Sequence, residues 1–80
     1  MTTTYAAYAL FTSSLQPSEH PSLARAKAAA VESLRQHGGP GGVEAAWATA
    51  YGEDPDTAPS RMRWALTLAQ QVTAGAQLAA

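Results

Sequence analysis

The side chains that could carry chemistry are few in this 80-residue chain, and their spacing fits no catalytic or metal-binding motif. His20 and His37 have no histidine or carboxylate three or four residues away, the spacing that places two metal ligands on one face of a helix. The chain has no cysteine, and its serines lack the motif that surrounds the nucleophile of a hydrolase. We therefore predict a protein that is not an enzyme and that binds no cofactor and no metal.

Two short segments have an unusual composition without the spacing of a ligand site. Residues 38–42, Gly-Gly-Pro-Gly-Gly, lack the Gly-Lys-Ser/Thr ending of a phosphate-binding loop, so we interpret them as a connector between two helices. Glu53, Asp54 and Asp56 form an acidic turn that does not follow the alternating carboxylates of a calcium loop. We expect this turn to be solvated, and a partner attracted to it would be basic.

The elements that must position these residues are predicted to be helices. Of the 37 apolar residues, 19 are alanine, which loses no side-chain entropy in a helix, whereas the residues that favour strands are few. A chain of this length provides material for one domain only. Because alanine buries little area, we expect a small core whose uncovered apolar surface a second copy could cover, giving a homodimer.

Apolar periodicity and helix-ending residues divide the chain into four helices within a single domain over residues 1–80. Pro17 ends the first helix, Pro21 starts the second, and the segments 38–42 and 53–56 provide the next two breaks. In chain order, the helices are expected over residues 5–15, 21–36, 43–52 and 57–78. We predict a compact all-α domain in which the third and fourth helices form an angled pair, similar to a helix-turn-helix.

The predicted second and fourth helices both have an apolar face. On the second helix this face comprises Leu23, Ala26, Ala30, Val31 and Leu34. On the fourth helix it is wider than contact with a single helix requires, because Trp64 and Leu68 extend it on one flank. Tryptophan is enriched at protein interfaces, so we predict that Trp64 and Leu68 contact a protein partner or a second copy.

Several residues of the third and fourth helices have the spacing of a helix-turn-helix. They are Ala48 where the two helices cross, Gly52 at the turn, and Thr57-Ala58, Ser60-Arg61-Met62 and Ala65 in the recognition helix. Residues 44–66 thereby resemble the helix-turn-helix of sigma-factor region 4 and of response-regulator output domains. The resemblance implies a DNA-binding transcriptional regulator in which Arg61 and Arg63 contact DNA.

The same resemblance implies that Arg61 forms an ion pair with a carboxylate of the preceding helix. Glu44, at the start of the third helix, is the candidate for this structural pair, and Glu32 on the second helix is a less well placed alternative. A further alternative is an Arg61 exposed to solvent in the first turn of the fourth helix.

Three features disfavour nucleic acid as the partner. The turn before the recognition helix is acidic, Pro59 falls within that helix and removes a backbone donor, and the net charge of the chain is −1. We therefore expect a protein that acts through protein–protein interaction or self-association, in a regulatory role, and we retain DNA binding as the alternative.

A second resemblance covers most of the chain. Leu10-Phe11, residues 15–18 and residues 61–65 are similar to segments of short, uncharacterised actinobacterial helical proteins, a resemblance that implies no activity. The chain has neither the positively charged start of a secretory signal nor an apolar run of 18 residues. We therefore expect a cytoplasmic protein without a membrane segment.

Overall fold

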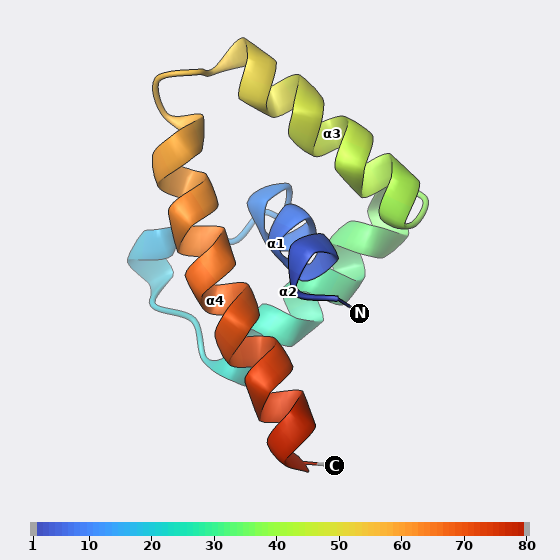
Figure 1. Cartoon of the computed structure of the whole chain (residues 1–80), viewed down its shortest axis with the longest axis vertical. Coiled ribbons are helices and arrows are strands. Elements are labelled where there is room, and N and C mark those ends of the chain that lie inside the picture. The colour runs from blue at the N-terminus through green and yellow to red at the C-terminus, as the bar shows by residue number, and fades with distance from the viewer. Residues whose placement is uncertain (1, 80) are drawn as a thin grey trace.

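The structure of the protein is a computed structural model that describes residues 2–79, with side chains described for residues 2–74. Its elements in chain order are α1 (Thr3–Phe11), the 3₁₀ turn η1 (Pro17–Glu19), α2 (Leu23–Gln36), α3 (Pro40–Glu53) and α4 (Ala58–Ala79). The predicted all-α class with four helices is confirmed, and α3 and α4 form the predicted angled pair, joined by a short turn (Figure 1).

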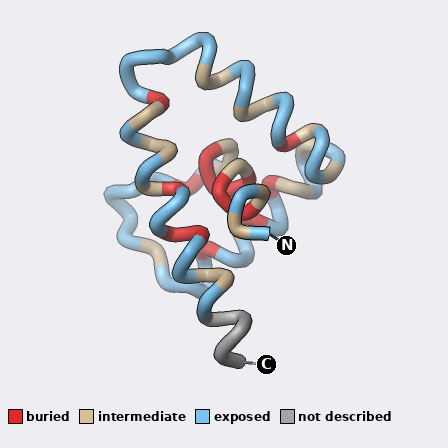
Figure 2. The backbone as a smooth tube through the Cα atoms, viewed as in Figure 1, coloured by how far each residue is buried: buried red, intermediate tan, exposed pale blue. Residues whose placement is uncertain are grey.

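The shortest α-helix, α1, lies at the centre of the core. It packs against α2, α3 and α4, and buried residues gather around it (Figure 2). Its buried residues are Ala6, Ala7, Ala9, Leu10 and Phe11. A helix that is apolar on most of its circumference is expected to be buried, and its alanines allow the neighbouring backbones to approach closely.

The first helix ends at Phe11 rather than at Leu15 as predicted, because residues with hydroxyl groups follow it. The Ser13 hydroxyl accepts a hydrogen bond from the backbone amide of Leu15 at 3.2 Å, an amide that would bond to the Phe11 carbonyl if the helix continued. The Thr12 hydroxyl donates to the Tyr8 carbonyl at 2.8 Å. The same Oγ1 lies 2.9 Å from Oγ of Ser33 on α2, and Ser33 is buried. The end of α1 is therefore tied to the neighbouring helix.

The predicted start of the second helix at Pro21 is also wrong, because a capping residue lies further along the chain. Ser22 is the N-cap of α2, and its hydroxyl accepts a hydrogen bond from the backbone amide of Arg25 at 3.1 Å. The helix itself therefore begins at Leu23.

The third helix begins three residues earlier than predicted, at Pro40, because only two of the glycines form the connection. Gly38 and Gly39 have φ angles of 79° and 99°, which glycine adopts more easily than any other residue. Pro40 then occupies the first turn of α3, where its missing amide would have no partner in any case. Gly41 and Gly42, predicted to lie in the connector, belong to the helix.

The apolar face predicted for α2 is only partly buried. Leu23 and Val31 are 46% and 53% exposed, whereas Ala26 and Ala30 are buried against the core. The buried face of α2 is thus made of small residues, and two of its larger apolar side chains lie outside the core.

The wide apolar face of α4 has a simpler explanation than an interface. The helix packs against both α1 and α2, so it needs a wider apolar face than contact with one helix would require. Leu68 is only 7% exposed and belongs to the core together with Ala65 and Ala69. Leu68, which we predicted to contact a partner, is therefore largely covered within the domain.

Candidate interaction surface

Arg61 connects the first turn of α4 to the end of α1. Its Nε donates to the Phe11 carbonyl at 2.8 Å, and its Nη2 donates to the carbonyls of Ser13 and Leu15 at 3.0 Å each. The guanidinium carbon also lies 4.9 Å from the ring centroid of Trp64. A single half-buried side chain therefore joins α4, the C-terminal end of α1 and the loop that follows α1.

The electrostatics of this contact favour a cation. The last carbonyls of a helix have no partner within the helix, and they carry the negative end of its dipole. Burial lowers the pKa of Arg61 from its ordinary value, because the charged form loses contact with water. A guanidinium nevertheless remains protonated in proteins, so Arg61 binds these carbonyls as a positive charge.

The predicted ion pair between Arg61 and Glu44 is wrong. Glu44 is exposed near the start of α3, whereas Arg61 lies in the first turn of α4, so about 13 Å of helix and a turn separate them along the chain. The alternative partner, Glu32, instead forms an exposed ion pair with Arg35 on the same helix. An Arg61 fully exposed to solvent is excluded as well, because its donors are bound to carbonyl groups.

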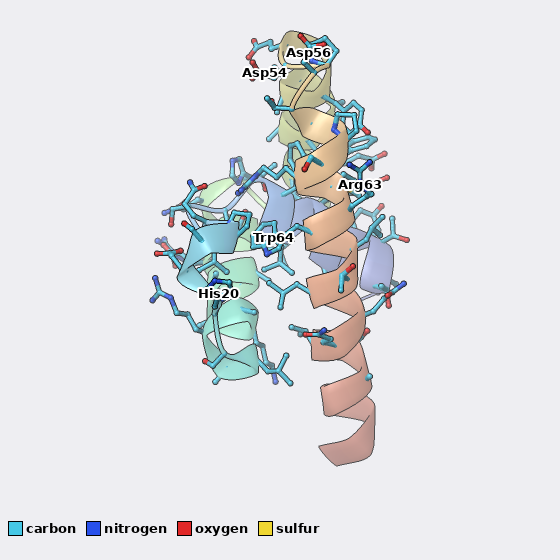
Figure 3. The ribbon with its side chains drawn as sticks, turned by 90° about the vertical axis from the view of Figure 1, so that its left-hand side faces the viewer. His20, Asp54, Asp56, Arg63 and Trp64 are labelled. Carbon is cyan, nitrogen blue, oxygen red and sulfur yellow. The ribbon has the colours of Figure 1, made fainter. Side chains whose placement is uncertain are left out.

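Arg63 and Trp64 leave α4 in different directions, with Trp64 directed toward η1 and α2 (Figure 3). Together with Thr67, Leu68 and Gln71 they line a shallow depression of about 360 Å³ on the surface of this helix. We call these five residues the α4 surface. Leu68 is its buried member, Trp64 is half-buried, and the other three residues are exposed.

The α4 surface combines apolar and polar side chains. An apolar centre made by an indole ring and a leucine is surrounded by side chains that can form hydrogen bonds, the usual arrangement of a protein interface. The guanidinium of Arg61 packs against the face of the Trp64 ring.

A cluster of aromatic side chains between α1 and α3 was not predicted from the sequence. The rings of Tyr8 and Trp47 stack with centroids 4.4 Å apart, and those of Phe11 and Tyr51 stack at 6.1 Å. The available signal was the spacing of these residues, because Tyr8 and Phe11 are three positions apart and Trp47 and Tyr51 are four apart. Such spacing shows that two residues share a face, but not which other helix that face meets.

The two predicted DNA contacts are not equivalent in the structure. Arg63 is exposed, whereas the guanidinium of Arg61 is directed into the protein and bound to carbonyl groups. Asp54 and Asp56 are exposed at the turn that precedes α4 (Figure 3). The start of α4 therefore offers one accessible arginine beside an acidic turn, an unfavourable arrangement for phosphate.

The part of the chain that the structure describes contains no group of three histidine, aspartate or glutamate side chains that could hold a metal ion. His20 is exposed, and His37 is half-buried with its Nδ1 atom 2.8 Å from the carbonyl oxygen of Ser33. The two predicted surface histidines are thus far apart in the sequence and differ in their surroundings.

The arrangement of helices and the α4 surface define a small four-helix domain with α1 at its centre. No family model, curated protein or solved structure matches the chain. Over the described residues, none of the helices has the length and hydrophobicity that crossing a membrane requires.

Proposed function

We propose that the protein acts by binding another protein chain through the α4 surface, without catalysing a reaction, and that the simplest such chain is a second copy of itself. A regulatory role would follow from such binding. The resemblance of residues 44–66 to a helix-turn-helix would then reflect the packing of α3 and α4 and not the reading of DNA.

The observation that supports this proposal is the position of Trp64. A tryptophan is left half-buried on the surface of α4, beside the exposed side chains of Arg63, Thr67 and Gln71. Burying the remainder of such a ring commonly supplies a large share of the binding energy at a protein interface. The ring is already ordered by Arg61, so it is suited to serve as an anchor.

We expect sedimentation at micromolar concentration to show a dimer, and Trp64→Ala to raise its dissociation constant about 30-fold, which corresponds to about 2 kcal/mol. Tyr5→Ala, at the far end of the core on α1, should raise it less than fivefold, since most interface energy resides in a few buried anchors. A wild-type protein that remains monomeric at these concentrations would remove self-association from the proposal.

Because Trp64→Ala also disturbs Arg61, a second variant separates binding from folding. Thr67 is exposed, so Thr67→Arg should fill the depression and block association while the melting temperature changes little. Ala48→Arg, on the exposed face of α3, is the matched control and should leave association intact. If Val31→Arg on α2 abolished association and Thr67→Arg did not, the exposed apolar part of α2 would be the interface instead.

DNA binding has one observation in its favour, the angled arrangement of α3 and α4 with Arg63 exposed near the start of α4. A gel-shift experiment with mixed genomic DNA separates the two proposals. At about 50 mM salt, where attraction to phosphate is strong, we expect no retarded band. A band that fades as salt rises, and that Arg63→Ala weakens while Arg25→Ala does not, would favour the DNA-binding alternative.

A further inference from the structure

We propose that α3 is a hinged flap, a segment that detaches from α1 as a unit while α1, α2 and α4 remain packed together. Its opening would switch the aromatic face of α1 between a covered and an accessible state. This inference goes beyond the proposed function and does not depend on it, because α3 contributes no residue to the α4 surface.

The composition of α3 makes it an unstable helix. Three of its 14 residues are glycines, Gly41, Gly42 and Gly52. All three lie in the first or last turn of the helix, and in a helix interior a glycine disfavours the helical state up to about fivefold relative to alanine. The N-cap residue Gly39 provides no side-chain hydrogen bond, whereas hydroxyl groups cap α1 and α2.

The contacts of α3 are mainly with α1, and few of its residues are fully buried. Val43 is its only buried residue, and Trp47, Ala50 and Tyr51 are half-buried, whereas the shorter α1 has five buried residues. The two ion pairs found among the described residues lie within residues 19–35 and do not involve α3. We expect a helix with so few fully buried residues to open at a lower free energy than the central helix α1.

One of the contacts that hold α3 is unfavourable in part. The indole Nε1 of Trp47 is buried and has no hydrogen-bond partner within the protein. A buried donor without a partner loses its bonds to water and gains nothing in return. Opening the flap would return this group to water, which partly offsets the loss of the stacking between Trp47 and Tyr8.

Both ends of α3 allow such a movement. Gly38 and Gly39 at its start have positive φ angles and open space where a side chain would stand. Their backbone amides donate to the carbonyls of Arg35 and Leu34 in α2, so the chain would turn between Gly39 and α3. At the other end, a short turn over residues 54–57 leads to α4, and α3 stands away from α4 beyond that turn (Figure 1). Opening would separate the ring pairs Tyr8–Trp47 and Phe11–Tyr51 and leave the interior of α1, α2 and α4 intact.

Native-state hydrogen exchange measured by NMR on the whole chain tests this proposal. We expect backbone amides in the middle of α3, residues 46–50, to exchange at least tenfold faster than those of α1, after correction for intrinsic rates. Their exchange should also depend less on denaturant, because a local opening exposes less surface than global unfolding does. Equal protection and equal denaturant dependence in α3 and α1 would overturn the proposal.

Two substitutions with opposite effects show whether the opening is confined to α3. Gly41 has open space around it and no positive φ angle, so Gly41→Ala should stabilise the closed helix and slow exchange in α3 about fivefold. Ala28→Gly, on the exposed face of α2, should speed exchange in α1 about fivefold and leave that in α3 unchanged. If Ala28→Gly accelerated exchange equally in α1 and α3, α3 would open only with the whole domain.

Discussion

Arg61→Ala should lower the free energy of unfolding by about 3 kcal/mol, because it removes three hydrogen bonds from a charged donor and leaves their carbonyl acceptors without partners. The carbonyls of Phe11, Ser13 and Leu15 converge on this guanidinium at 2.8 to 3.0 Å. Hydrogen bonds with a charged partner contribute about 1.5–3 kcal/mol each, and the cost of removing the charge from water offsets part of that sum. Urea unfolding followed by far-UV circular dichroism measures the difference.

Two control variants determine whether the carbonyl contacts are responsible. Glu44→Ala should change stability by less than about 0.5 kcal/mol, because this exposed carboxylate does not pair with Arg61, and the effects of the two substitutions should add. Arg61→Lys should lose much of the stabilisation, since an ammonium group lacks the fork that reaches carbonyls in several directions. A loss below about 1 kcal/mol for Arg61→Ala would mean that water can replace the guanidinium at these carbonyls.

We expect Gly42→Ala to destabilise the protein by about 3 kcal/mol, although it replaces a glycine by the best helix former. A side-chain carbon at residue 42 would overlap the backbone carbonyl of His37, at the end of α2. A backbone carbonyl cannot move aside as the end of a flexible side chain can, so the start of α3 would have to shift away from α2. This strain outweighs the gain in helix propensity, which is about 1 kcal/mol.

The adjacent residue provides the matched control. Gly41→Ala introduces the same methyl group where nothing lies within 4 Å, so we expect it to stabilise the domain by about 1 kcal/mol. Thermal melts of both variants measure the effects, and the melting temperatures should move in opposite directions. Stabilisation by both alanines would show that α3 does not approach His37 as closely as the structure indicates.

The proposals of protein binding and of a hinged α3 can fail separately. The α4 surface lies on one helix, and its test is the oligomeric state of Thr67→Arg. The flap is tested by hydrogen exchange in α3, a measurement on one chain that requires no partner. A monomeric protein with fast exchange in α3 would retain the flap and remove self-association.

The sequence by itself determined the all-α class, the number of α-helices and the bounds of the last of them. Alanine favours helices in any surroundings, and a proline or a glycine pair interrupts a helix through its own backbone restrictions. The predicted helix bounds were wrong where a side-chain hydrogen bond set the first or last residue of a helix. Ser13 ended α1 and Ser22 started α2 through hydrogen bonds that depend on local geometry as well as on residue type.

The tertiary structure alone decided what each helix face contacts. Periodicity placed Leu68 on the apolar face of α4, but the sequence could not show that Leu68 meets the core or that Arg61 meets the carbonyls of α1. Backbone carbonyls are present at every residue and leave no mark in a sequence, so a cation that binds them has no recognisable partner. For the same reason, Glu44 could be named from the sequence as a candidate ion-pair partner of Arg61, because its carboxylate belongs to its residue type. The actual acceptors lie 46 to 50 positions away along the chain and became evident only from the packing of α1 against α4.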